Sequence, residues 1–284
     1  MDIRKAVFAG SWYPNRASAC EKAIGEFLDQ GPGPPEGLAS FMGGIVPHAG
    51  WVYSGRVACN VINCLKDADP PDLVVILGMH LHAASPNHMM DRGAWETPFG
   101  PLPVAGDLAD VLKDQFSFQL ETPQHFVQDN TVELQMPFIK YLLTPAAVLA
   151  VGIAPRDSSI EIGRAVADWA VKNGRRIKII GSTDLTHYGR NYGFMPQGSG
   201  KKALDWVRQE NDRRLIDALL AMAPQQVIAE GLEHLNACCA GAAAATLAGV
   251  RQMGARHARL VEYATSYDVS PGDSFVGYAG VVFG

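Results

Sequence analysis

The fold is decided by a short pattern whose clearest copy is Leu73-Val74-Val75-Ile76-Leu77, followed directly by Gly78-Met79-His80. Five consecutive apolar residues bounded by a glycine predict a strand that is buried on both faces. Other runs of the same character lie along the chain, at residues 44–46, 147–153, 177–180 and 275–283. We therefore expect these runs to form one central sheet.

Segments with apolar residues at helical spacing lie between the runs, at Ala17–Asp29, Val57–Lys66, Leu108–Gln115, Ser159–Asn173 and Lys202–Met222. Strands that alternate with helices predict an α/β fold, with a doubly wound, mostly parallel central sheet flanked by helices. No stretch has the length of a linker, so we expect a single domain over residues 1–284.

The composition is that of an ordinary globular protein, because 48% of the residues are hydrophobic and 19% are charged. A formal net charge of −5 argues against a nucleic-acid partner. No apolar run reaches the roughly 20 residues of a membrane span, and we expect no secretory signal. The five cysteines lack the spacing of a disulfide framework, which favours free thiols in a reducing cytoplasm.

Three predicted strands end in residues that can bind a metal or carry a proton. His48 follows the first run within a Pro-His-Ala-Gly loop, His80 and His82 follow the second, and Asp184 follows residues 177–180. Ligands of open α/β sheets bind outside the carboxyl ends of the strands. A histidine on a stiff loop suits a metal ligand, although a turn histidine bonded to the backbone is equally expected for His48 taken alone.

Two more pairs could contribute to such a site. Asp184 and His187 are three residues apart, so one helical turn would align them, and the aspartate could then orient the imidazole as a general base or ligand. Asp184 could equally cap a short helix. Cys238 and Cys239 open an alanine-rich helix whose dipole favours a thiolate, and we expect one of the two to be functional and the other to be packing.

Other polar residues are expected to be unremarkable. Glu133 reads as a solvated residue on a helix face or as a partner of a metal ligand, and His88 and His125 read as loop residues. No Gly-x-Gly-x-x-Gly loop, Walker-type loop or Gly-x-Ser-x-Gly elbow is found, so nucleotide binding and serine hydrolysis have no support in the sequence.

The order of several motifs resembles that of the Memo family, which occurs in prokaryotes beside radical-SAM proteins. The matching segments run nearly from end to end: Ala6–Pro14, Pro47–Gly55, Trp95–Gly100, Val132–Phe138, Ser182–Gly189 and Val276–Ala279. The Pro-His-Ala-Gly and Ser-x-Asp-x-x-His-Tyr-Gly elements are the most specific of these. The resemblance implies a fold similar to that of the class III extradiol dioxygenases.

The resemblance also implies a site. Its metal ligands would be His48, a histidine of residues 78–82 and Cys238, while His187 would take the place of an acid/base histidine, with Asp184 beside it. Fe(II) is the metal that the resemblance favours, and copper or zinc are alternatives for a His/Cys set.

The chain departs from the family pattern at three positions. The family's Gly-Pro-x-His is one residue shorter here, which leaves His80 or His82 as the second ligand, and the spacing to Trp95 favours His80. Asn130 stands where the family has a histidine. The family's Cys-Gly is Cys238-Cys239 here, and the spacing to Gly241 favours Cys238 as the ligand.

Three functions are compatible with these residues. The first is a redox-active mononuclear metal enzyme of unknown small-molecule substrate, by analogy a dioxygenase-type oxidoreductase. The second is a binding or scaffold protein whose cleft takes a peptide or protein partner and is lined by Trp12, Tyr13, Trp51 and Tyr53, which could equally be core residues. The third is a zinc-dependent hydrolase. Self-association into a homo-oligomer is expected to be feasible.

Overall fold

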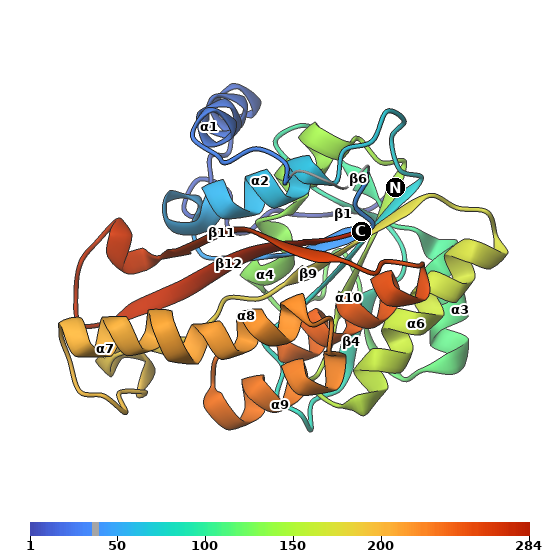
Figure 1. The fold of residues 1–284 in the computed structure, drawn as a ribbon. Coiled ribbons are helices and arrows are strands. Elements are labelled where there is room, and N and C mark those ends of the chain that lie inside the picture. The colour runs from blue at the N-terminus through green and yellow to red at the C-terminus, as the bar shows by residue number, and fades with distance from the viewer. Residues whose placement is uncertain (36–39) are drawn as a thin grey trace.

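A nine-stranded mixed sheet runs through the computed structural model, which describes residues 1–35 and 40–284 (Figure 1). Its four central strands are parallel and occur in the order β2 (Gly43–Val46), β9 (Ile177–Ser182), β3 (Leu73–Gly78) and β8 (Ala147–Gly152). The predicted α/β fold is therefore confirmed, and the parallel part of the sheet is its centre.

Antiparallel strands flank this centre on both sides. Beyond β2 lie β12 (Phe275–Phe283), β11 (Ala258–Thr265) and β10 (His187–Tyr188), and beyond β8 lie β4 (Asn87–Met90) and β7 (Phe118–Glu121). The loop between β3 and β4 is shorter than the roughly dozen residues that a parallel crossover needs, so β4 returns antiparallel to β8. A second, three-stranded sheet combines β1 (Ile3–Arg4), β5 (Ala94–Trp95) and β6 (Leu102–Pro103).

Helices cover both faces of the sheet (Figure 1). One face packs against α1 (Ala17–Asp29), α2 (Arg56–Cys64), the short helices α4 (Asn130–Glu133) and α5 (Met136–Phe138), and the π turn Ile139–Leu143. The other packs against α3 (Gly106–Gln115), α6 (Asp157–Lys172), α8 (Asp212–Leu220), α9 (Pro224–His234) and α10 (Ala240–Gln252). Neighbouring residues of β3 explain its unbroken apolar run, because Val75 and Leu77 join one core while Val74 and Ile76 join the other.

Two predicted helices differ in detail from those in the structure. The helix predicted over residues 202–222 consists of α7 (Lys201–Trp206), a π turn over Val207–Asn211 and α8. The alanine-rich helix α10 begins at Ala240, with Cys239 as its N-cap residue, so Cys238 precedes the helix. Small side chains let α10 lie close against α6, where a Cβ on Gly163 would meet the carbonyl oxygen of Ala245 at 1.9 Å.

Glu133 ties the N-terminal segment to helix α4, and the expectation of a solvated residue or a partner of a metal ligand is wrong. Its side chain is only 1% exposed. Its carboxylate accepts hydrogen bonds from the backbone N–H groups of Val7 and Phe8 and from the hydroxyl of Tyr13. The next turn of the chain, which carries Trp12, is thereby held beside the loop that follows β2.

His88 also differs from its prediction as a loop residue. It lies in β4, is buried, and its Nδ1 is 3.2 Å from Oε1 of Glu121, which also pairs with Arg4.

Within the described residues, no helix is long and apolar enough to cross a membrane.

Asp212 holds the loop between β9 and β10 in place through hydrogen bonds to Thr186. Its buried carboxylate accepts hydrogen bonds from the backbone N–H and the hydroxyl of Thr186, and from the Tyr263 hydroxyl at 2.7 Å. Burial raises the pKa of Asp212 to about 6, although hydrogen bonds from Thr186 and Tyr263 oppose the shift. The loop that carries Asp184 and His187 therefore rests on a carboxyl group with three donors.

We expect Asp212→Ala to lower the free energy of unfolding by about 2–4 kcal/mol, because it leaves buried donors without an acceptor. Asp212→Asn is the matched control and should lose less, since its amide oxygen can accept from Thr186 and its amide nitrogen can donate to Tyr263. Urea denaturation of the two variants and the wild type measures the difference.

The contribution of Asp212 to the free energy of unfolding changes with pH in a defined direction. A folded pKa of about 6 lies above the unfolded value, so the folded protein holds a proton that the unfolded chain releases between about pH 4 and 6. The stability of the wild type relative to Asp212→Asn should be greatest below about pH 4 and fall as the pH rises through 6. A relative stability that increases over this range would contradict the prediction.

Candidate metal centre

His48 is held from two sides at the end of β2. Its backbone N–H donates to Oδ1 of Asp184 at 2.7 Å, and its carbonyl oxygen accepts from the side-chain amide of Asn130 at 2.8 Å. The side chain is only 1% exposed. The loop after β2 therefore presents the imidazole in a fixed position, as the Pro-His-Ala-Gly sequence predicts.

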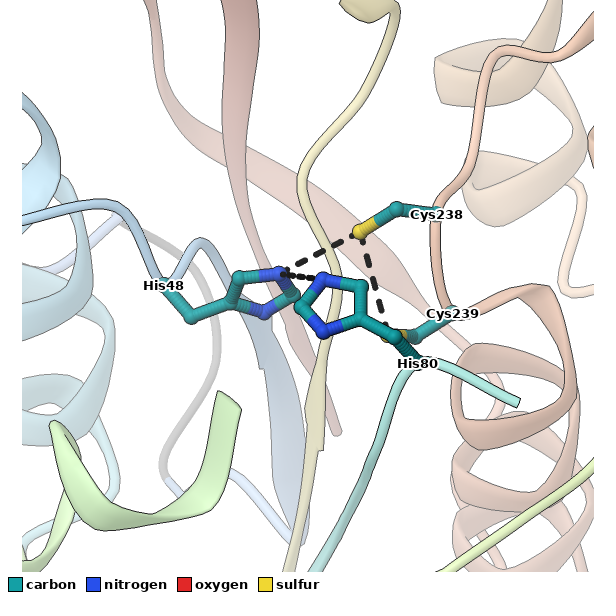
Figure 2. Close-up of side chains that lie close together, drawn as sticks. All are labelled: His48, His80, Cys238 and Cys239. Carbon is teal, nitrogen blue, oxygen red and sulfur yellow. Dashed lines mark hydrogen bonds between the residues drawn. The ribbon is translucent and has the colours of Figure 1, made fainter. Parts of the chain in front are cut away.

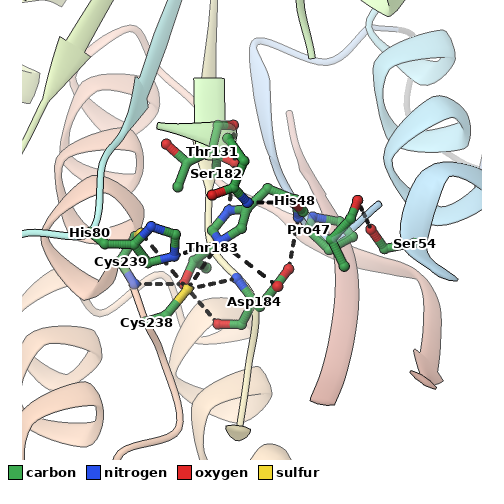
Figure 3. Close-up of polar contacts among 12 residues, drawn as sticks. Pro47, His48, Ser54, His80, Thr131, Ser182, Thr183, Asp184, Cys238 and Cys239 are labelled. Atoms are coloured by element: carbon green, nitrogen blue, oxygen red, sulfur yellow. Dashed lines mark hydrogen bonds and ion pairs between the residues drawn. The ribbon is translucent and has the colours of Figure 1, made fainter. Parts of the chain in front are cut away.

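Hydrogen bonds determine which nitrogen of His48 carries a proton. The hydroxyl of Ser182 donates its proton to a hydrogen bond with the carbonyl oxygen of Thr131 at 2.7 Å (Figure 3). Oγ of Ser182 must therefore accept a hydrogen bond from Nδ1–H of His48, which lies 2.9 Å away. Nε2 of His48 is then left with a lone pair that points into the site.

His80 reaches the same point from the loop after β3. Met79 adopts a left-handed conformation with φ of 77°, and its N–H donates to the hydroxyl of Thr131 at 2.7 Å. A strained non-glycine residue in such a place is typical of functional sites. The backbone N–H and Nδ1 of His80 both face Oδ2 of Asp129 at 3.3 Å, which makes Nδ1 the protonated nitrogen.

His82 lies outside the site. It is exposed on the same loop, and its Nδ1 accepts a hydrogen bond from the backbone N–H of Ala84 at 3.2 Å. The structure therefore brings His80, and not His82, next to His48.

The two imidazoles face each other through their Nε2 atoms, because each Nδ1 is turned to an acceptor. Nε2 of His48 and Nε2 of His80 are 3.2 Å apart (Figure 2). Two acceptors cannot bond at this distance without a cation between them, which can be a proton or a metal ion. Burial lowers the pKa of His80, but hydrogen bonds to Asp129 and Cys238 outweigh burial and raise it to about 10.

Cys238 completes the convergence of donor atoms. Its Sγ lies 3.2 Å from Nε2 of His48 and accepts from the backbone N–H of Asp184 at 3.2 Å. Burial raises the pKa of this thiol, but hydrogen bonding to Cys239 and the positive charge on His48 outweigh burial and hold it well below its usual range. A thiolate and two imidazole nitrogens therefore meet at one point, a donor set that fits a transition metal.

Asp184 and His187 approach each other without the predicted helical turn. Residues 183–186 form an irregular segment between β9 and β10, and Asp184 Oδ2 lies 3.7 Å from Nε2 of His187 and 3.8 Å from Nε2 of His48. Nε2 of His187 is buried and has no hydrogen-bond partner among the described residues. Burial lowers the pKa of His187, and Asp184 and Cys238 more than compensate, so the pKa is raised.

Four residues that support the site were not predicted from the sequence: Asp129, Asn130 as a donor, Thr131 and Ser182. Asp129 is the N-cap residue of α4 and Thr131 lies in its first turn. In the sequence, the pair therefore looks like an ordinary helix start. Ser182 is the last residue of β9, and only its position opposite Nδ1 of His48 reveals its role.

A cleft of about 880 Å³ opens above the histidines. All four aromatic residues considered for this role, Trp12, Tyr13, Trp51 and Tyr53, line it, and Tyr192 joins them. Trp51 also belongs to the core, since its ring stacks on Phe138 with centroids 4.1 Å apart. The rings of Trp12 and Tyr53 are partly exposed at the rim.

All five cysteines are free thiols, as the sequence predicts. Cys20, Cys59 and Cys64 are buried within the core between the sheet and helices α1 and α2. Burial raises the pKa of each of the three to about 11 or 12. These thiols are therefore packing residues, whereas Cys238 and Cys239 lie beside the histidines.

Comparisons with known proteins bear on the fold and the family of the chain. An uncharacterized protein of Escherichia coli K12 has a crystal structure that matches with a TM-score of 0.54 at 10% identity, over 85% of this chain and 99% of that one, and shows likeness of fold alone. A MEMO1 family protein of Pyrococcus furiosus is 32% identical over 99% of this chain and 98% of its own length. Another from Methanothermobacter thermautotrophicus is 33% identical over 98% of this chain and 99% of its own length.

The model of the Memo-like protein family matches residues 4–282, nearly the whole chain. Together with the relatives of similar length, this match shows that the chain belongs to the Memo-like protein family.

Proposed function

We propose that this protein binds one transition-metal ion through His48, His80 and Cys238 and acts as an oxidoreductase on a small molecule held in the cleft. One observation carries the proposal: the Nε2 atoms of His48 and His80 face each other at 3.2 Å, and Sγ of Cys238 lies 3.2 Å from one of them. His48 is buried while His80 is open to the cleft, and a metal ion between them would satisfy all three donors at once.

The donor set leads to a choice of metal. Iron(II) is our first choice because of the family resemblance, and copper is the alternative that a thiolate beside two imidazoles also suits. A redox-active ion held by three protein donors would supply electron transfer and open coordination positions. The carboxylate of Asp129 and the hydroxyl of Ser182 would fix the orientation of the two imidazoles.

His187 supports an enzymatic role more than a purely structural one. The residue lines the cleft, and its Nε2 lacks a hydrogen-bond partner among the described residues and faces the Asp184 carboxylate at 3.7 Å. Asp184 stabilises the protonated imidazole, so His187 can accept a proton at Nε2 from a bound molecule and return it.

A second candidate function rests on the rim of the cleft. Trp12, Val52, Tyr53 and Tyr192 are all exposed there, between 40% and 70% of their surface. Such a rim of aromatic and aliphatic side chains suits a peptide or protein partner, for which the metal would not be needed.

Metal content is the first test of the proposal. Protein purified without oxygen should contain about one equivalent of iron or copper, and His48→Ala and Cys238→Ala should each lose most of it, because each removes one donor of the set. His82→Ala is the matched control, since it removes an exposed histidine of the same loop as His80, and it should keep the metal. Elemental analysis gives the occupancy.

Each alternative predicts a different result of this measurement. One equivalent of zinc in wild type would contradict the oxidoreductase, and it would favour a zinc-dependent hydrolase only if the ion keeps an open coordination position. No bound metal in wild type, even after incubation with iron(II), copper or zinc, would sink the proposal and leave the binding function as the better candidate.

The second test addresses His187. We expect His187→Asn to keep the metal but to slow oxygen uptake with aromatic diols by about 100- to 10,000-fold, the range typical of a lost general base. Oxygen consumption is measured with an electrode, and Tyr192→Phe serves as a control at the neighbouring ring. If the variant loses metal together with activity, His187 has a structural role and the prediction is wrong.

A further inference from the structure

A second thiol lies beside the proposed ligands and has no part in the function described so far. Sγ of Cys239 is 3.7 Å from Sγ of Cys238 (Figure 2). One donor atom from each of His48, His80, Cys238 and Cys239 lies within 4.8 Å of all the others. The cluster therefore holds four potential donors.

The backbone fixes the position of Cys239. Its N–H donates to the hydroxyl of Thr183 at 3.0 Å, and its carbonyl oxygen accepts from the N–H of Ala243 at 3.1 Å in the first turn of α10. Its side chain is 2% exposed. The backbone of Cys239 is thus held at the start of a helix, next to the end of β9, and its thiol is buried there.

The sulfur–sulfur and nitrogen–nitrogen distances are close to those of a tetrahedral metal site, and all other separations are within 4.8 Å. Bonds of about 2.0–2.1 Å to nitrogen and 2.3 Å to sulfur place two sulfurs roughly 3.8 Å apart and two nitrogens roughly 3.4 Å apart. The observed separations are 3.7 Å between the sulfurs and 3.2 Å between the imidazole nitrogens. The four atoms could surround one ion after shifts of about an ångström or less.

A disulfide between the two cysteines fits the same geometry poorly. Neighbouring residues have Cα atoms about 3.8 Å apart, whereas disulfides usually span 4.4–6.8 Å. The two sulfurs would also have to move from 3.7 Å to about 2.05 Å. The pair is spaced for sharing an ion and not for bonding to each other.

We propose that Cys239 is a fourth protein donor, which lets the site close around a thiophilic ion such as zinc(II) with two histidines and two cysteines. This inference rests on the proposed metal site at His48, His80 and Cys238. A four-donor set leaves no open position, as in structural zinc sites, whereas iron(II) would use three donors and leave the Cys239 thiol protonated. Cys239 would then be the residue that sets metal preference in this chain.

The experiment uses the full chain, freed of metal and loaded anaerobically with zinc(II) or with iron(II) alone. X-ray absorption spectra of the zinc form should fit two sulfur and two nitrogen neighbours in wild type, and one sulfur in Cys239→Ala and Cys239→Ser. Competition with a chelator should show zinc affinity reduced at least about 100-fold in Cys239→Ala. A residue that only hydrogen-bonds to a metal ligand typically costs about 10- to 100-fold when it is lost. Iron(II) affinity should change less than about tenfold.

The outcomes separate this inference from the proposed function. One sulfur neighbour in wild type, or equal zinc affinity in wild type and Cys239→Ala, overturns the role of Cys239 and leaves the three-donor site standing. No metal binding in wild type overturns both. Circular dichroism of the serine variant, which keeps a side chain of similar size, shows whether a loss of affinity comes from lost folding.

Discussion

Asp184 is the residue on which much of the geometry of the site depends, because it contacts His48, Cys238 and His187. Its Oδ1 holds the backbone of His48, its own backbone N–H and carbonyl oxygen bond to Sγ and N–H of Cys238, and its Oδ2 faces His187. These residues come from three parts of the chain. A single buried aspartate just after β9 therefore fixes the relative positions of the loop after β2, the start of α10 and the strand β10.

The convergence of donors creates an electrostatic requirement for a cation, which either a proton on the imidazoles or a metal ion can meet. Ser182 and Asp129 each accept a hydrogen bond from Nδ1–H of one imidazole, so the two Nε2 atoms point at each other at 3.2 Å. Two carboxylates and a thiolate of lowered pKa surround them. This concentration of negative charge and lone pairs in a buried space, open to a cleft on one side, is the physical basis of the proposed metal site.

Particular residues show how far sequence reasoning reaches. The unbroken run Leu73–Leu77 identified a doubly covered strand, and the Pro-His-Ala-Gly loop identified His48 as a strand-end histidine, because both signals are local. Glu133 was misjudged, since its partners are 120 or more residues away and leave no mark on the neighbouring sequence. The helix predicted around Asp184 was wrong because the segment is instead stabilised by Asp212, which lies in another helix.

The sequence by itself determined the α/β fold class, the family and the residues able to bind a metal, because apolar periodicity and motif order are properties of contiguous segments. Tertiary structure decided that His80 and not His82 faces His48, since the left-handed turn at Met79 aims only the first of them inward. It also placed Cys239 within 3.7 Å of Cys238 and aligned the imidazoles through Ser182 and Asp129. These features depend on distances between strands and loops far apart in the chain, which no local pattern encodes.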